Sequence, residues 1–277
     1  MQGGLYRSMA LALTKGAQKP EMAWEALTRE LDLWQEAGRT ATFWWRDDDA
    51  ADHTDALDTL LNLRDTLDVP LALAVIPARA TAALHTRLGD TNDCSVLQHG
   101  YSHKNFADPQ ARKIELDDSR PAAYVIGDLA TGAQALESFP GHLPVLVPPW
   151  NRIAAHLIPF LPELGFRGLS TIGARTRPDP IAGLRANNVH VDLVDWRGKR
   201  TGSAGGFLGV ETILGDTVAH LSARRTGAAD REEATGLMTH HAVLDGESTD
   251  FLSEFVARTR AHGAVRWLAA EEMFPAP

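Results

Sequence analysis

Three consecutive carboxylates, Asp47, Asp48 and Asp49, directly follow a short β-prone run at Thr40–Trp45. Adjacent carboxylates repel one another, and this crowding raises their pKa values unless a cation compensates. A bound metal ion is one such cation. A polar loop that caps the next helix is the plain alternative, and the triplet alone does not decide between the two.

Two histidines, His99 and His103, follow a second strand-like run at Cys94–Gln98. Side chains four residues apart face the same side where the chain turns helically. Neutral imidazoles suit Zn²⁺, Co²⁺, Ni²⁺ or Fe²⁺. This spacing is common by chance, but an acidic strand end in the same fold strengthens the interpretation of the two histidines as metal ligands. Two histidines and one carboxylate also leave coordination positions open, as a catalytic metal site requires.

Aromatic and proline residues form a third cluster in the segment 147–152, after a strand at Val145–Val147. Pro148 and Pro149 stiffen the segment, and Trp150 offers a flat apolar wall for a sugar ring. A rigid turn with a core tryptophan is the equally weighted alternative. In either case the segment follows a strand, as the first two clusters do.

Two further clusters, at residues 192–196 and 237–241, also lie at strand ends. A histidine there could donate a proton to a leaving amine. His240 and His241 are adjacent, so on a strand they point in opposite directions and only one can enter a site. Parallel barrels place catalytic groups at the carboxyl ends of their strands, so the shared placement is stronger evidence than any one cluster.

Strand-like and helical patterns alternate along the chain, which predicts a parallel sheet with helices outside it. We therefore expect a distorted (β/α) barrel, complete or incomplete, of about seven parallel strands, with a doubly wound open sheet as the alternative. We expect further strands at Pro70–Ile76, Phe166–Ser170, Val189–Val194 and Gly236–Thr239, and helices at Glu21–Ala37, Thr54–Leu67, Ala78–Leu88, Pro121–Ser138, Ile153–Leu164, Glu211–Arg224 and Asp250–His262.

The composition is that of a globular α/β protein of 277 residues with 44% hydrophobic residues and a net charge of −9. An acidic chain argues against nucleic acid or an anionic membrane as the main partner, and no apolar run reaches the length of a membrane span. The single cysteine, Cys94, excludes an intrachain disulfide. We expect residues 1–18 to be a loose lead-in without a convincing secretion signal, residues 19–277 to form one domain, and the protein to be cytoplasmic. The oligomeric state stays open.

From Thr40 to His241 the clusters resemble, in order, the five motifs of the polysaccharide deacetylase (NodB-homology, carbohydrate esterase) family. The resemblance implies a catalytic base at Asp48 and a metal ligand at Asp49, although a register of Asp47 and Asp48 is also open. It implies metal ligands at His99 and His103. It also implies a catalytic acid at His240.

The remaining site residues follow from the same resemblance and from the strand-end clusters. Asp195 or Arg152 is expected to orient Asp48 or His240. The substrate-binding candidates are Tyr101, Pro149, Trp150 and Trp196.

Two residues, Val147 and Gly100, depart from the family pattern. Val147 stands where the family has an arginine that orients the catalytic aspartate, and Arg46 or Arg152 is a candidate substitute. Gly100 replaces the usual serine or threonine after the first histidine.

The expected activity is the metal-dependent removal of an acetyl or related acyl group from the nitrogen of an amino sugar or oligosaccharide. One divalent ion is expected, with Zn²⁺ as the default and Co²⁺, Ni²⁺ or Fe²⁺ as alternatives. A small-molecule amidohydrolase acting on a cyclic amide or ureide, and a non-catalytic carbohydrate-binding relative, are the competing interpretations.

Overall fold

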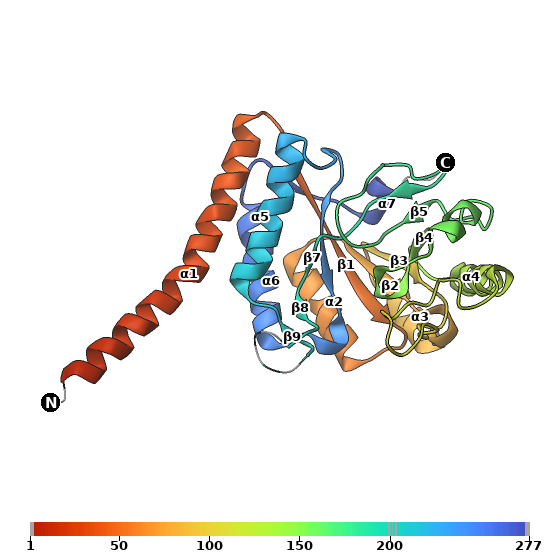
Figure 1. Cartoon of the computed structure of the whole chain (residues 1–277), viewed down its shortest axis with the longest axis horizontal. Helices are drawn as coiled ribbons and strands as arrows, with labels where there is room; N and C mark the ends of the chain where they lie inside the picture. The colour runs from red at the N-terminus through yellow and green to blue at the C-terminus, as the bar shows by residue number, and fades with distance from the viewer. Residues whose placement is uncertain (1–2, 199, 201, 203, 275–277) are drawn as a thin grey trace.

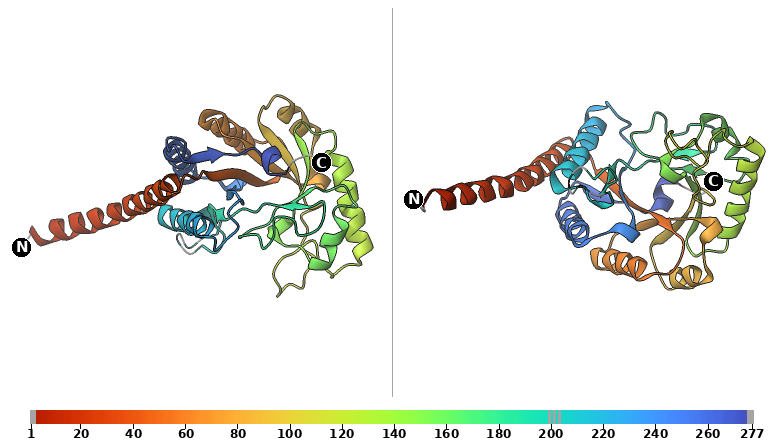
Figure 2. Two further views of the ribbon diagram at one scale, coloured as in Figure 1. Left: turned by 90° about the horizontal axis from the view of Figure 1, so that it is seen from above. Right: turned by 60° about the horizontal axis from the view of Figure 1, so that its bottom comes forward.

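A curved parallel sheet with helices on its outer side forms the body of the protein (Figure 1 and Figure 2). The computed structural model describes residues 3–198, 200, 202 and 204–274, and side chains from residue 19 onward. The strand order is β6-β5-β4-β3-β2-β1-β10-β7, with β11 paired to the first part of β1. This is an incomplete α/β barrel, so the predicted barrel is confirmed in its incomplete form. Among the described residues nine strands take part, against the expected number of about seven.

The strands of the sheet are β1 (Ala41–Ala50), β2 (Leu71–Val75), β3 (Cys94–His99), β4 (His142–Val147), β5 (Gly168–Leu169), β6 (Arg185–Ala186), β7 (Val191–Asp192), β10 (Thr235–Thr239) and β11 (Val265–Trp267), while β8 (Val194–Asp195) and β9 (Gly206–Phe207) form a separate antiparallel pair. The α-helices are α1 (Gly3–Glu36), α2 (Asp55–Leu67), α3 (Ala82–Gly89), α4 (Ala122–Leu136), α5 (Val210–Thr226), α6 (Gly246–Arg260) and α7 (Ala270–Met273). Short 3-10 helices are η1 (Pro77–Arg79), η2 (Pro149–Asn151), η3 (Ala155–Phe160) and η4 (His241–Val243).

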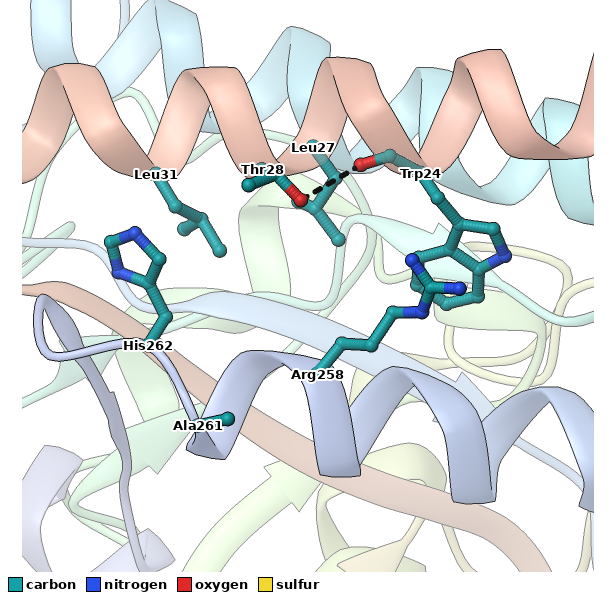
Figure 3. Close-up of a pocket in the computed structure, with 7 residues that line it drawn as sticks. All are labelled: Trp24, Leu27, Thr28, Leu31, Arg258, Ala261 and His262. Carbon is teal, nitrogen blue, oxygen red and sulfur yellow. Dashed lines mark hydrogen bonds between the residues drawn. The ribbon is translucent and has the colours of Figure 1, made fainter.

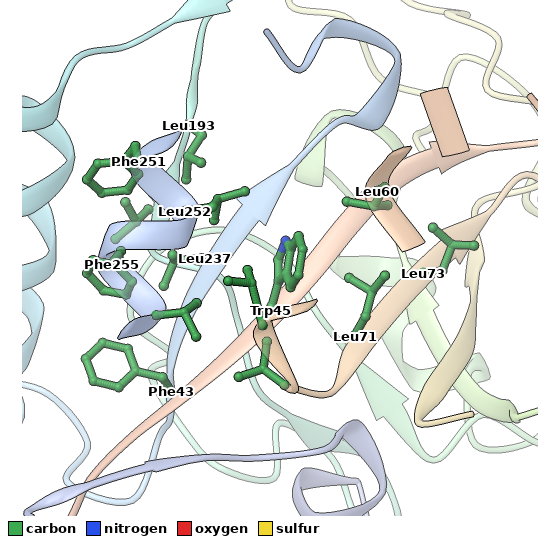
Figure 4. Close-up of a cluster of buried hydrophobic side chains, with 14 of the residues drawn as sticks. Phe43, Trp45, Leu60, Leu71, Leu73, Leu193, Leu237, Phe251, Leu252 and Phe255 are labelled. Atoms are coloured by element: carbon green, nitrogen blue, oxygen red, sulfur yellow. The ribbon is translucent and has the colours of Figure 1, made fainter. Parts of the chain in front are cut away.

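The larger hydrophobic core fills the space between the convex face of the sheet and the outer helices. Phe43 and Trp45 on β1 point into it, together with Leu237 of β10 (Figure 4). Phe251 and Phe255 of α6 cover them, and the Phe43 and Phe255 rings meet edge to face. This packing fixes which residues of β1 face outward.

The concave face of the sheet carries a second, smaller core. Because side chains alternate along a strand, Trp44 points to the opposite face from Phe43 and Trp45. Trp44 packs there with Met238 of β10 and Met273 of α7. The same alternation predicts that Arg46 and Asp48, further along β1, face the concave side.

Strand β1 runs five residues beyond the predicted Thr40–Trp45 strand and includes the acidic triplet, which the prediction placed after the strand. Its pairing with β2 shifts between Asp47, which faces Leu73, and Ala50, which faces Val75. The extra residue is a β-bulge, and Asp49 within it has a φ of 76°. A bulge re-aims side chains that would otherwise alternate. Asp48 and Asp49 are therefore not restricted to opposite faces.

Helix α1 continues N-terminally from the predicted Glu21–Ala37 helix to Gly3, so residues 3–18 are helical rather than a loose lead-in. Its C-terminal half lies beside α5 and α6. A cavity of about 200 Å³ lies between α1 and α6, where Arg258 stacks over the Trp24 ring (Figure 3). Among the described residues, no helix is both long and apolar enough to cross a bilayer.

The expected helix at Ile153–Leu164 is reduced to the 3-10 helix η3. Pro159 lies inside it and Pro162 follows shortly after. Prolines lack the N–H group that an α-helix interior needs, so the two prolines keep this connection from forming a regular α-helix.

Candidate metal and catalytic site

Asp49, His99 and His103 come together at the carboxyl ends of β1 and β3. The Nε2 atoms of both imidazoles lie 3.1 Å from the same oxygen, Oδ1 of Asp49. His99 ends β3, and His103 follows after a turn in which Gly100 and His103 have φ values of 54° and 56°. A turn with left-handed residues, rather than the helical turn considered from the spacing, therefore brings the two rings together.

The hydrogen bonding of this trio fits a divalent cation. His99 Nδ1 lies 3.0 Å from the carbonyl oxygen of Val147, and a carbonyl only accepts, so His99 donates its Nδ1–H there. That arrangement turns Nε2 toward the Asp49 carboxylate. Burial lowers the pKa of His99, but its hydrogen bond with Asp49 and the nearby carboxylates outweigh this and raise the pKa overall. A metal ion would replace the proton that these groups otherwise share.

The electrostatics of Asp49 agree with this interpretation. Burial raises the pKa of Asp49, but hydrogen bonds with His103 and His99 more than compensate and lower it. The side chain of Asp49 is 35% exposed and that of His103 is 18% exposed, whereas His99 is buried. The trio is therefore anchored on its His99 side and accessible to solvent on the other, as a catalytic metal site needs.

Glu115 holds the loop between the two histidines. Its buried carboxylate accepts hydrogen bonds from Ser102 N and Ser102 Oγ, at 2.7 and 2.8 Å, and from Tyr101 N at 3.3 Å. A Cβ atom on Gly100 would lie 2.2 Å from Glu115 Oε2 and 2.5 Å from a carbon of Pro149. Glycine at 100, where the family usually has serine or threonine, is thus required by space as well as by its φ. The backbone N–H of Tyr101, one of the substrate-binding candidates, is directed at Glu115.

Asp48 lies next to the trio and is held by Arg46. Arg46 Nε and Nη2 donate to Asp48 Oδ1 and Oδ2 at 2.8 and 2.9 Å, a two-point ion pair with both residues buried. Arg46 also donates to Ser170 Oγ at 2.7 Å and to Asn151 Oδ1 at 2.6 Å. Burial raises the pKa of Asp48, but Arg46, His99 and His240 together lower it, so Asp48 is a fixed carboxylate.

Asp47 forms its hydrogen bonds on the opposite face of β1 from Asp48. Its Oδ1 lies 2.6 Å from His241 Nδ1, and its Oδ2 accepts from Thr239 Oγ1 at 2.6 Å. Burial lowers the pKa of His241, but Asp47 outweighs this effect and raises it. Because Asp47 is occupied by His241 and Thr239, the geometry favours Asp48 and Asp49 over Asp47 and Asp48 as the base and ligand.

His240 follows β10 and lies against Trp196, whose ring centroid is 4.8 Å away in an edge-to-face arrangement. Trp196 Nε1 donates to Asp192 Oδ2 at 2.8 Å. Burial raises the pKa of Asp192, and the nearby His240 partly offsets the rise. The buried Nδ1 of His240 has no hydrogen-bond partner among the described residues. Asp192, Trp196 and His240 thus form one polar group beside Asp48.

Asp195 and Arg152, the two expected orienting residues, are placed differently. Asp195 accepts hydrogen bonds from the backbone N–H groups of Arg197 and Arg200, which caps the turn that follows it. Arg152 Nη1 donates to the carbonyl oxygen of Lys113 at 2.7 Å. Arg46, the other candidate for the missing family arginine, is the residue that pairs with Asp48.

The aromatic candidates border the trio. The Trp150 ring lies 4.4 Å from that of His103, centroid to centroid, and Trp196 is 49% exposed. Pro149 is buried beneath Gly100. Trp150 is therefore a partly exposed wall beside the candidate metal ligand His103, which agrees with the sugar-stacking alternative better than with the core alternative.

Sequence reasoning missed several residues of the site. Glu115 carries no motif and lies far from either histidine pattern. Ser170 ends the strand-like run 166–170, so its strand-end position was a usable signal. Asp192 lies in the predicted cluster at 192–196, but the three-residue spacing to Asp195 does not reveal which aspartate approaches His240.

A second group, His190, His220 and Glu233, has ligand-type atoms close together but does not fit a metal ion. The two imidazole rings are stacked, with centroids 3.4 Å apart and planes 16° from parallel. A metal bound to both Nε2 atoms would lie far out of at least one ring plane, since Zn–N bonds are only about 2.1 Å long. His190 Nδ1 also accepts the Gly236 N–H, which places the imidazole proton on Nε2.

Similarity to known proteins is found in structure rather than in sequence. No family profile and no curated protein matches the chain. A putative polysaccharide deacetylase from Mycobacterium smegmatis superposes with a TM-score of 0.63 and 21% identity, covering 85% of this chain and 90% of that one. The Bc1960 peptidoglycan N-acetylglucosamine deacetylase superposes with a TM-score of 0.52 and 15% identity, covering 88% of this chain and 96% of that one.

A family 4 acetyl xylan esterase from Clostridium thermocellum, in complex with a cobalt ion, superposes with a TM-score of 0.50 and 12% identity, covering 84% of this chain and 90% of that one. At these identities the likeness speaks for the fold. The resemblance seen in the five motifs is thereby confirmed at the level of the backbone, and the chain has the fold of the NodB-homology polysaccharide deacetylases.

Proposed function

We propose that the protein is a metal-dependent hydrolase that removes an acetyl or related acyl group from the nitrogen of an amino sugar or oligosaccharide. The observation that carries the proposal is the shared contact of His99 Nε2 and His103 Nε2 with Asp49 Oδ1, next to the buried carboxylate of Asp48. The fold neighbours include proteins named as deacetylases and esterases, which supports the same reaction class.

Asp49, His99 and His103 would hold the ion through one carboxylate oxygen and two Nε2 atoms. Such a cation polarises an amide carbonyl and lowers the pKa of bound water toward about 7. Zn²⁺ is the default for this ligand set, and the cobalt in the esterase neighbour keeps Co²⁺ open.

Asp48 is suited to accept the proton of the attacking water. Its pKa lies below the ordinary value, so it is ionised at neutral pH, and Arg46 fixes the orientation of its oxygens. His240 is suited to donate a proton to the leaving nitrogen, with Asp192 and Trp196 beside it. Trp150 would stack on the sugar ring.

Acetate release from N-acetylated sugars and oligomers, measured with metal-loaded protein, tests the proposal. Asp48→Asn should retain the metal and lose most turnover, because the carboxylate that accepts the proton is gone. Activity on cyclic amides or ureides alone would favour the small-molecule amidohydrolase alternative. Metal binding without hydrolysis of any of these amides would favour the non-catalytic alternative.

A further inference from the structure

Three cationic residues lie close to one another near Trp150, which borders the candidate site. Lys113 Nζ is 6.0 Å from the centroid of the Trp150 ring, which in turn contacts the ligand His103. Arg152 lies two residues after Trp150 and bonds to the Lys113 carbonyl. Arg112 is close enough to Arg152 to repel it electrostatically.

The backbone holds these cations in place although they come from two separate segments. Leu116 and Ile153 form a parallel bridge, and Ala154 N donates to the carbonyl oxygen of Leu116 at 2.8 Å. Together with the bond from Arg152 to Lys113, these contacts tie residues 112–116 to residues 150–154. The segment that carries Arg112 and Lys113 is therefore held against the loop that carries Trp150 and Arg152.

No ion pair offsets this charge within the part of the chain that the structure describes. Arg112, Lys113 and Arg152 take part in none of its ion pairs, although the chain carries 36 acidic residues against 27 basic ones. Burial and the repulsion from Arg112 both lower the pKa of Arg152. Like charges held together cost free energy unless an anion binds between them.

We propose that the substrate carries an oxyanion substituent, a carboxylate or a phosphate, that binds to Arg112, Lys113 and Arg152 while its sugar ring packs on Trp150. Arginine forms two-point hydrogen bonds with both groups, and lysine adds a point charge. The proposal rests on the proposed function for the position of the amide at Asp49, His99 and His103. It adds that the preferred substrate is an acidic N-acylated sugar rather than a neutral one.

Binding of three sugars that differ only at C6 tests this, measured by calorimetry on the metal-loaded protein at low and at high salt. The probes are N-acetylglucosamine, its 6-phosphate, and N-acetylglucosaminuronic acid. The wild-type protein should bind at least one acidic sugar about tenfold more tightly than the neutral one, and salt should reduce the difference. The acid that binds better identifies the oxyanion as phosphate or carboxylate.

The double variant Lys113→Gln/Arg152→Gln should bring the ratio of acidic to neutral affinity close to one. Arg266→Gln is the matched control, because Arg266 is exposed on β11, pairs with Glu272 and lies by the amino end of β1. Equal binding of all three sugars by the wild-type protein, or a preference that survives in the double variant, overturns the proposal. Binding does not require turnover, so a retained preference without hydrolysis would refute the proposed function alone.

Discussion

Arg46 and Asp48 lie two residues apart on β1, and their side chains form a two-point ion pair on the concave face of the sheet. Both follow Trp44 in the strand alternation, so the hydrophobic packing of Trp44 also sets the side on which the pair lies. The arginine thus approaches the proposed base from the same strand. In the family pattern the orienting arginine stands at the position of Val147.

Arg46→Lys should lower kcat without loss of metal. Lysine keeps the positive charge but cannot make two parallel hydrogen bonds, so the Asp48 carboxylate would lose its fixed orientation. We expect a decrease in kcat of about tenfold or more, since catalysis depends steeply on the position of the base. Turnover and metal content measured on the same preparation check this, with Arg266→Lys as the control. Unchanged kcat would show that Arg46 has no positioning role.

Asp49→Asn and Asp47→Asn should separate metal binding from folding stability. Asp49→Asn removes a charged ligand, so metal should be lost. Asp47→Asn should retain the metal but lower the free energy of unfolding by about 1–3 kcal/mol, because it weakens buried hydrogen bonds to His241 and Thr239. Elemental analysis and denaturant unfolding of both variants decide the assignment. Loss of metal from Asp47→Asn together with retention of metal by Asp49→Asn would show that Asp47, and not Asp49, is the ligand.

Glu115→Gln should weaken metal binding although Glu115 does not belong to the ligand trio. The amide would turn its NH₂ group toward one of the two backbone N–H groups, of Ser102 or Tyr101, that donate to the carboxylate oxygens, which loosens the loop that carries His103. Groups that support ligands typically change metal affinity 10- to 100-fold, so we expect a loss of about tenfold. Competition with a chelator measures it. Glu137→Gln, an exposed site on the far end of α4, is the control.

The convergence of Asp49, His99 and His103 could be predicted from the sequence because all three follow strand-like runs, and parallel strands bring their carboxyl ends to one edge. The register of the acidic triplet, Asp48 and Asp49 or Asp47 and Asp48, stayed open in the sequence because it depends on a β-bulge that no local propensity reveals. Similarly, the choice between Asp192 and Asp195 depends on a break between the two-residue strands β7 and β8. The cytoplasmic location remains a prediction.

Stability should fall at acid pH because of two buried imidazoles, those of His190 before β7 and His220 on α5. Burial, His190 and Arg224 lower the pKa of His220 to about 2, and burial lowers that of His190. A histidine whose pKa falls on folding contributes stability that is complete above about 6.5 and is lost as the pH falls toward 2. His220→Asn should therefore reduce the loss of unfolding free energy between pH 7 and pH 5 by about 2 kcal/mol. Urea unfolding at both pH values measures this, with the exposed His156→Asn as the control. An identical pH dependence in wild type and His220→Asn would mean that the pKa of His220 is the same in the folded and unfolded states, which would contradict the prediction.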